Sequence, residues 1–264
     1  ELQVQSILRE IIDPNTGKDY VTSREVGEIR INSNNVSLEI VLSYPAKSLF
    51  ENIRSQVIEK LKMIPDIGEI EVNISSKIIS RATQRGVQHI PEVKNIIAVA
   101  SGKGGVGKSA TAVNLALALA YEGASVGILD ADIYGPSQPQ MLGVSGRPES
   151  KDGKHMEPLE AHGIQIISIG LLVDIETPMV WRGPMVTQAL QQLLNDTRWR
   201  DIDYLIVDMP PGTGDIQLTL AQKVPVTGAV IVTTPQDIAL LDARKGLKMF
   251  EKVGIPIIGI VENM

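Results

Sequence analysis

The 264-residue sequence contains no cysteine and only three histidines. No residue of this sequence can therefore contribute to a disulfide framework or to a thiolate metal site. Two of the histidines, His155 and His162, lie in a polar stretch with several glycines, which favours solvated loop residues over metal ligands. Aromatic residues make up 3% of the chain, so the sequence does not predict a surface on which nucleic acid bases stack.

Positive charge and long apolar runs are also scarce. The formal net charge is −6, which disfavours non-specific binding to DNA. No apolar run approaches the ~18 residues of a membrane-spanning helix, and no secretory signal or transit peptide is recognised. We therefore expect a cytoplasmic protein that binds neither nucleic acid nor membrane. Because the sequence begins with Glu1 rather than Met, we also expect that the natural N-terminus is missing.

The hydrophobic content of 43% is enough for a globular core, and two parts of the chain carry different patterns. Residues 1–76 predict a helix, two strands, a second helix over 47–63 and a third strand, which together form a small α+β domain. This part contains no catalytic constellation. Residues 77–94 are polar and predict a linker.

Residues 95–264 alternate apolar runs with helical segments, which predicts an α/β domain. Its parallel sheet is expected to be buried on both faces by helices. Right-handed crossovers place the loops that follow the strands at one edge of the sheet, where ligands bind. The predicted strands are 96–100, 126–129, 164–169, 204–207, 229–232 and 257–261.

Residues 102–109 fit the phosphate-binding pattern G-x-x-x-x-G-K-[ST] between a predicted strand and a predicted helix. Glycines let backbone N–H groups surround phosphate oxygens, and the helix N-terminus adds positive potential. Lys108 is expected to reach the outer phosphates, and the Ser109 hydroxyl to ligate Mg²⁺.

The same glycines, Gly102, Gly104 and Gly107, also satisfy G-x-G-x-x-G, and Asp130 lies near the position of a dinucleotide binder's ribose acid. The pair Lys108-Ser109 favours a nucleoside triphosphate over a dinucleotide, because a Rossmann loop has no use for it.

Carboxylates follow two of the predicted strands. Asp130 and Asp132 come directly after the strand 126–129, and Asp208 ends the strand 204–207. A carboxylate at the tip of an apolar strand is the Walker B arrangement, in which it holds a Mg²⁺-bound water. Gly212 and Gly214 would let the loop after Asp208 shift with the γ-phosphate.

Lys103 is an unusual second lysine inside the loop, and residues 103–109 match K-G-G-x-G-K-[ST]. This stretch resembles the deviant Walker A family, which includes MinD, ParA, the nitrogenase iron protein and the Mrp/ApbC-type iron–sulfur carriers. The resemblance implies an ATPase that works as a homodimer. It also implies that Lys103 contacts the nucleotide of the partner subunit, that Asp132 positions the attacking water and that Asp130 supports the Mg²⁺ shell.

Three sets of site residues follow from the motif and the resemblance. The expected catalytic residues are Lys103, Lys108 and Asp132, and the expected Mg²⁺ residues are Ser109, Asp130 and Asp208. Nucleotide contacts are expected from Gly102, Lys103, Gly104, Gly105, Val106, Gly107, Lys108, Ser109, Ala110 and, as an adenine-reading amide, Asn263. No N-K-x-D guanine motif is present, which favours ATP.

Within that family the chain most resembles the Mrp/ApbC-type carriers, on the stretches 129–137, 181–184, 208–215 and 261–264. Its first 76 residues resemble the small domain of iron–sulfur assembly factors, although Ala46 and Lys47 stand where some members have a cysteine. The resemblance implies a slow ATPase that delivers clusters to apo iron–sulfur proteins and works with scaffold proteins. Trp181 and Arg182 are expected at a dimer or switch contact, or in the core.

The family continues into a C-P-x-C motif that holds a [4Fe–4S] cluster between two subunits. The present sequence has no such motif, so we expect a C-terminal truncation and no cluster ligand in these 264 residues. Two alternatives remain at this point. One is a ParA/MinD-like positioning ATPase that acts on DNA or membrane, and the other is a dinucleotide-dependent oxidoreductase.

Overall fold

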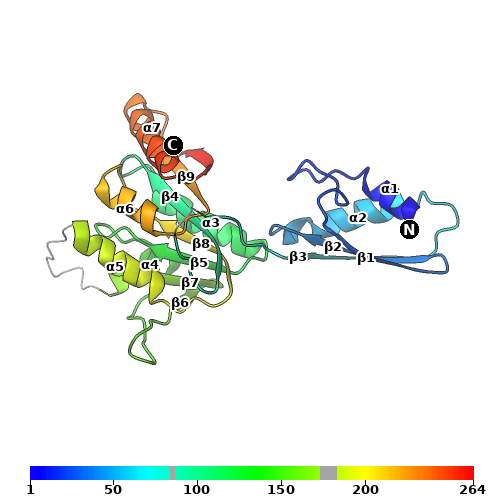
Figure 1. Ribbon diagram of the computed structural model, residues 1–264, viewed down its shortest axis with the longest axis horizontal. Helices are drawn as coiled ribbons and strands as arrows, with labels where there is room; N and C mark the ends of the chain where they lie inside the picture. The colour runs from blue at the N-terminus through cyan, green and yellow to red at the C-terminus, as the bar shows by residue number, and fades with distance from the viewer. Residues whose placement is uncertain (84–86, 173–182) are drawn as a thin grey trace. The chain divides into compact units, whose positions relative to one another are not determined.

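The computed structural model describes residues 1–83, 87–172 and 183–264 (Figure 1). The chain divides into two compact units. The first contains Glu1–Ile79 with Tyr121–Gly123, and the second contains Ser80–Ala120 with Ala124–Met264.

The first unit has the predicted α-β-β-α-β order. Its three-stranded sheet has the order β1-β2-β3, with β1 antiparallel to β2 and β2 parallel to β3. A short 3₁₀ turn at Lys47–Leu49 precedes the second helix. The elements are α1 (Leu2–Leu8), β1 (Val26–Asn32), β2 (Asn35–Leu42), α2 (Phe50–Leu61) and β3 (Ile70–Ser76).

Alternate residues of β2 form the core of this unit. Leu38 and Ile40 are buried and pack in one apolar cluster with Val57 and Leu61 of α2. This alternation is the pattern of a sheet with one face covered and one face open. The core of this unit therefore lies between the buried face of β2 and α2.

The second unit is built on a seven-stranded sheet with the order β10-β9-β4-β8-β5-β7-β6. Every neighbouring pair is parallel except β6, which runs antiparallel to β7. The strands are β4 (Val93–Ser101), β5 (Val126–Asp130), β6 (Leu159–Ala161), β7 (Ile164–Ser168), β8 (Ile202–Asp208), β9 (Gly228–Thr233) and β10 (Ile257–Glu262).

Helices cover both faces of this sheet, as predicted for a P-loop NTPase fold (Figure 1). Buried residues of α3 and α4 share one cluster with Val99, whereas those of α5, α6 and α7 share another with Ala98. The α3 residues at this contact include Ala112 and Ala116, whose small side chains allow close approach to the strands. The helices are α3 (Lys108–Tyr121), α4 (Gln138–Leu142), α5 (Gly183–Asn195), α6 (Asp215–Lys223) and α7 (Asp237–Lys252).

The sheet departs from the predicted parallel, doubly covered pattern at its two edges only in detail. The antiparallel strand β6 was not predicted, because three residues are too few to produce an apolar run. At the other edge, β10 has a single neighbour, and its Ile258 and Ile260 are 59% and 58% exposed. Burial on both faces is therefore a property of the central strands.

The segment predicted as a linker is partly built into the second unit. The strand β4 begins at Val93, two residues before the predicted boundary. The Ser80 hydroxyl donates to the Lys94 carbonyl at 2.9 Å, and Ile90 is buried. Of the helices in the described ranges, none combines the length and apolarity that a bilayer span requires.

Candidate nucleotide-binding site

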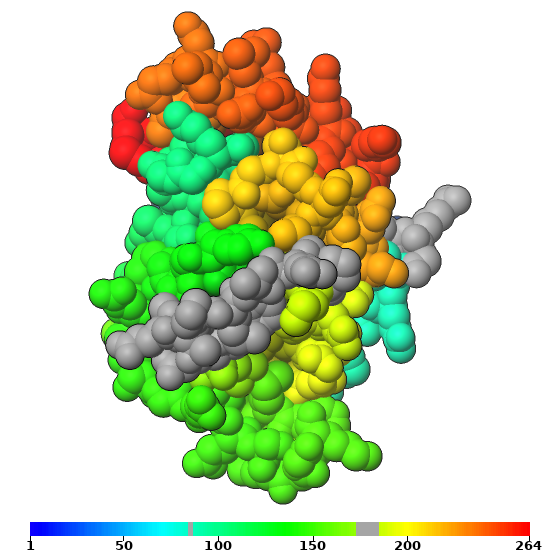
Figure 2. All heavy atoms as spheres, turned by 90° about the vertical axis from the view of Figure 1, so that its left-hand side faces the viewer, coloured from blue at the N-terminus to red at the C-terminus, as the bar shows by residue number. Residues whose placement is uncertain are grey.

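Three segments far apart in the sequence meet at the carboxyl edge of the large sheet. The strands β4, β8 and β5 are adjacent in the sheet, and the register pairs Asp130 with Asp208 and Val99 with Asp208. Figure 2 views the face where the phosphate loop (residues 102–109, teal) lies beside the segment after β5 (green) and the segment after β8 (gold). The sheet order therefore brings the predicted loop and the predicted carboxylates together.

The phosphate loop is closely packed on one side and open on the other. A Cβ at Gly102 would overlap the backbone of Asp242 in α7, and a Cβ at Gly107 would overlap the Asn263 amide. Beside Gly104 and Gly105, by contrast, a Cβ would meet nothing within 4 Å. Gly105 and Gly107 adopt φ values of 79° and 84°, which favour glycine. The open side and the positive φ values of these two glycines fit a phosphate cradle.

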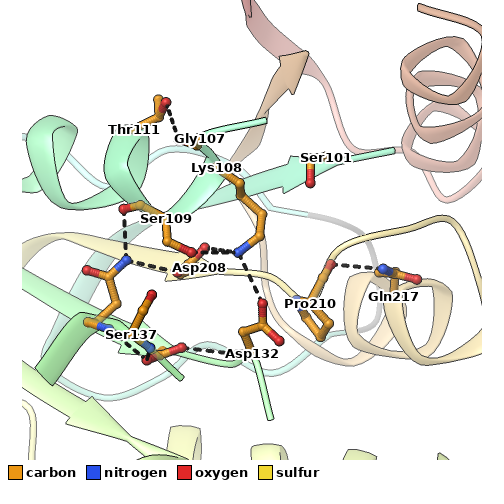
Figure 3. A network of polar contacts seen from close by, with 12 residues as sticks. Ser101, Gly107, Lys108, Ser109, Thr111, Asp132, Ser137, Asp208, Pro210 and Gln217 are labelled. Carbon is orange, nitrogen blue, oxygen red and sulfur yellow. Dashed lines mark hydrogen bonds and ion pairs between the residues drawn. The ribbon is translucent and has the colours of Figure 1, made fainter. Parts of the chain in front are cut away.

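Lys108 is the central cation of the site (Figure 3). Lys108 is the first residue of α3 and is only 5% exposed. Its Nζ is paired with Asp208 Oδ1. The same Nζ lies 3.1 Å from Ser109 Oγ and 3.7 Å from Asp132 Oδ2. One ammonium group thus contacts three side chains that the sequence assigns to the site.

Asp208 is fully buried, and each of its oxygens has a partner. Oδ1 faces Lys108, and Oδ2 accepts a hydrogen bond from Gln138 Nε2 at 2.8 Å. Gln138, which is also fully buried, donates from the same nitrogen to the Ser109 carbonyl at 2.9 Å. Sequence reasoning missed Gln138, although it directly follows the stretch 129–137 that carries the family resemblance.

Asp130 is enclosed by donors from the protein itself. Its Oδ1 accepts from the Asp132 N–H at 3.2 Å, and its Oδ2 accepts from Ser137 N, Gln138 N and Ser168 Oγ at 3.0 to 3.1 Å. Burial and the nearby Asp208 raise the pKa of Asp130 to about 6. Asp130 thus shapes the segment after β5, and its predicted role at the Mg²⁺ site remains a prediction.

Asp132 has one oxygen near Lys108 and one without a partner. Oδ1 is buried and accepts no hydrogen bond from any residue within the described ranges. Burial raises the pKa of this carboxyl group, and the Lys108 ammonium opposes that shift. A buried acceptor without a donor is a place where a water molecule fits.

Lys103 and Asn263 lie at the phosphate loop in different ways. Lys103 is half-buried, and its Nζ forms no hydrogen bond or ion pair with the described part of the chain. Asn263 Nδ2 donates to the Val106 carbonyl at 3.0 Å and thereby ties the end of β10 to the loop. The adenine-reading role predicted for Asn263 remains a prediction, since one amide hydrogen and Oδ1 are left for another partner.

The loop after Asp208, residues 209–214, is held by specific bonds. Gly212 has a φ of 106°, and its N–H donates to the Ser101 carbonyl at 2.9 Å. The buried side chain of Gln217 donates to the Pro210 carbonyl at 2.8 Å (Figure 3) and accepts from the Gly214 N–H at 2.7 Å. These bonds must break if the loop shifts. The predicted contacts of Trp181 and Arg182 fall outside the described residues.

Oxygen ligands for Mg²⁺ are few. Residues 1–83, 87–172 and 183–264 hold no group of three or more histidine, aspartate or glutamate side chains arranged around a metal site. The Ser109 hydroxyl and the Asp208 carboxylate are the predicted ligands that lie together beside Lys108. These two groups suit an ion that takes its other ligands from phosphate and water, as Mg²⁺ does.

Family comparison identifies the chain. Residues 92–264 match the model of the ParA family described as the NUBPL iron-transfer P-loop NTPase. The chain belongs to this iron-transfer P-loop NTPase family. Residues 1–74 match a second model, that of the iron–sulfur cluster assembly protein. The predicted family and the predicted P-loop NTPase fold are thus confirmed, and the dinucleotide oxidoreductase is excluded.

Individual relatives agree with this family. The iron–sulfur cluster carrier protein of Escherichia coli K12 is 54% identical over 252 residues, which cover 95% of this chain and 68% of that protein. The carrier protein of Pseudomonas fragi is 63% identical over 200 residues, which cover 75% of this chain and 70% of that protein.

Among solved structures, a nucleotide-binding protein from Archaeoglobus fulgidus in complex with ADP is 38% identical. The TM-score is 0.57, and the match covers 65% of this chain and 67% of that protein. The cell division ATPase MinD from Pyrococcus furiosus is 24% identical with a TM-score of 0.48, and the match covers 64% of this chain and 71% of that protein.

Proposed function

We propose that this iron-transfer P-loop NTPase binds and hydrolyses ATP, and that its nucleotide state controls the delivery of iron–sulfur clusters to apo iron–sulfur proteins. One observation carries the proposal. Lys108, Ser109 and Asp208 are gathered beside a glycine loop whose outer side is open, in a chain that belongs to this family.

Nucleotide binding exchanges the partners of Lys108. In the present state its ammonium is neutralised by Asp208 and Asp132, which substitute for the negative charge of phosphate. When phosphate enters the loop, Lys108 turns to the outer phosphates, and Asp208 becomes available as an oxygen ligand together with Ser109. Bound Mg²⁺ neutralises charge that develops on the phosphate oxygens.

Hydrolysis requires a positioned water and a further cation. The Oδ1 atom of Asp132 is buried and accepts no hydrogen bond from the described residues, and the other oxygen of the same carboxylate lies 3.7 Å from Lys108 Nζ. This position supports a role for Asp132 in holding the attacking water. The Nζ of Lys103 has no partner in the described part of the chain, which supports its assignment as the lysine that reaches the nucleotide of a second copy in a homodimer. Such a cation acts like an arginine finger, worth about 10³–10⁵ in rate in other systems.

The cluster is the cargo in this proposal. The 264 residues contain no cysteine, so the thiolates that hold a [4Fe–4S] cluster are not among them. The role assigned to these residues is the nucleotide-dependent switch. The recipients and donors of the cluster are apo iron–sulfur proteins and scaffold proteins.

The proposal is tested by measuring ATP affinity and ATP turnover for the wild type and for two variants, Lys108→Ala and Lys103→Ala. Lys108→Ala is expected to abolish ATP binding, because the phosphates lose their main cation. Lys103→Ala is expected to keep ATP binding but to lose turnover and nucleotide-linked dimerisation. Unchanged ATP affinity in Lys108→Ala, or wild-type turnover in Lys103→Ala, would contradict the respective assignment.

A further inference from the structure

Gln138 is a buried amide that touches three segments of the candidate site. It begins α4 and is fully buried, and its backbone N–H donates to Asp130 Oδ2 at 3.0 Å. Its side-chain nitrogen reaches the first turn of α3 at Ser109 and the end of β8 at Asp208. No motif assigns a role to this residue.

The two side-chain bonds of Gln138 use one nitrogen. Nε2 donates one hydrogen to the Ser109 carbonyl at 2.9 Å and the other to Asp208 Oδ2 at 2.8 Å. The Asp208 carboxylate is negatively charged and the Ser109 carbonyl oxygen is partially negative, so the two oxygens repel each other unless a hydrogen-bond donor lies between them. An amide NH₂ group supplies two hydrogens without adding a charge.

This bridge fixes the orientation of Asp208. With Oδ2 held by Gln138, Oδ1 is the oxygen that faces Lys108. The same Lys108 ammonium contacts the Ser109 hydroxyl, so both predicted ligands lie beside one cation. Gln138 thereby sets the relative position of the two residues to which the Mg²⁺ site is assigned.

A second observation points to a bound group near this amide. Gln138 Oε1 is buried and accepts no hydrogen bond from the described residues, and the same is true of Asp132 Oδ1. A buried acceptor without a donor costs free energy and calls for an explanation such as a water or a ligand. Both acceptors belong to side chains that contact Lys108 or Asp208, so a water molecule or a ligand at this position would satisfy them.

The geometry points to Gln138 as a positioning residue for the Mg²⁺ site. Gln138 holds the predicted ligands Ser109 and Asp208 in the arrangement that the ion requires. The inference rests on the proposed function, because the ion enters with the nucleotide. Residues that hold metal ligands in this way typically change metal affinity or activity by about 10–100-fold when they are replaced.

The inference is tested by measuring the equilibrium binding of a non-hydrolysable ATP analogue, once with Mg²⁺ and once with EDTA. The variant Gln138→Met keeps the length of the side chain and removes both donated hydrogens. We expect the gain in analogue affinity that Mg²⁺ provides to fall by about 10–100-fold, with the affinity in EDTA unchanged. The matched control is Gln140→Met, the same change on an exposed residue of the same helix, which is expected to behave like the wild type.

Two outcomes would overturn the inference. The first is a Mg²⁺-dependent gain in Gln138→Met equal to that of the wild type. The second is an equal loss of affinity with Mg²⁺ and with EDTA, which is the result of a purely structural role. If Gln138→Met does not fold, Gln138→Asn replaces it, because its amide is one methylene too short to bridge both acceptors and the same selective loss is expected. Binding of the analogue to the wild type is measured first. If the wild type binds no nucleotide, the proposed function itself is refuted.

Discussion

Lys108→Met removes the cation that is paired with Asp132 and Asp208 at the candidate site. Asp208 is fully buried and Asp132 is 8% exposed, and Lys108 is paired with both. Asp130, which is also fully buried, lies beside them. Methionine keeps the length of the side chain and removes its charge. We expect the variant to be less stable without any nucleotide, because it leaves buried carboxylates unpaired.

The magnitude follows from the cost of burying an unpaired charge. Removal of one partner of a buried ion pair typically costs about 3–5 kcal/mol. A carboxylate can avoid this cost by taking up a proton. With an unfolded-state pKa near 3.9 and ~1.4 kcal/mol per pH unit, that proton costs about 4 kcal/mol at pH 7 and about 1.5 kcal/mol at pH 5. Burial raises the pKa of Asp132 and the Lys108 ammonium opposes that shift, so the pKa of Asp132 is expected to rise further in the variant. The stability of the variant therefore decreases as the pH rises.

Tryptophan fluorescence during thermal unfolding measures this effect in the second unit alone, because both tryptophans of the sequence, at 181 and 199, follow residue 80. At ~2–4 °C per kcal/mol, the midpoint of Lys108→Met is expected to fall by about 8–16 °C at pH 7 and by about 3–6 °C at pH 5. Lys103→Met is the control, since Lys103 has no partner in the described residues, and we expect no change in its midpoint. An equal loss at both pH values, or a loss no greater than that of the control, would refute the reasoning.

Three further predictions concern other features of the chain. In Gly107→Ala the new Cβ would overlap the Asn263 amide at a position with a φ of 84°, so the free energy of unfolding in urea should fall by at least about 1 kcal/mol. The control Gly135→Ala has open space around the new Cβ and should leave the free energy of unfolding unchanged. Asp130, whose pKa rises from 3.8 to about 6, contributes stability that is present below pH 3.8 and is lost as the pH rises through 6. The wild type should therefore lose unfolding free energy between pH 4 and pH 7, and Asp130→Asn should flatten that slope; an equally steep slope in the variant would count against this account. These 264 residues, reconstituted with iron and sulfide, should give no stoichiometric cluster absorbance in the visible range, and such a signal would contradict the absence of thiolates.

Much of the site could be predicted because parallel strands impose its geometry. The phosphate loop, Asp130 and Asp208 each follow an apolar strand, and the ends of neighbouring parallel strands share one edge of a sheet. The pattern of the sequence is therefore enough to place these side chains near one another. The family resemblance added the expectations for Lys103 and Asp132, which no periodicity contains.

The sequence could not predict features that depend on hydrogen bonding in the folded chain. The carboxylates Asp130 and Asp208 look alike as strand-end acids, yet Asp130 is saturated by backbone N–H groups and Asp208 pairs with Lys108. Gln138 has no signature of its own, because its importance arises only when α3, β8 and the segment after β5 meet. The strand β6 is too short to produce a pattern.

The most direct test of the central claim is ATP hydrolysis by a mixture of two variants. Lys103→Ala is expected to bind ATP but to lack the lysine that acts on the partner's nucleotide, and Lys108→Ala is expected to offer that lysine but to bind no ATP. Each variant alone is predicted to be inactive, and an equimolar mixture is predicted to recover turnover in mixed dimers. A mixture with no more turnover than the sum of the separate variants, measured beside an active wild type, would contradict the account.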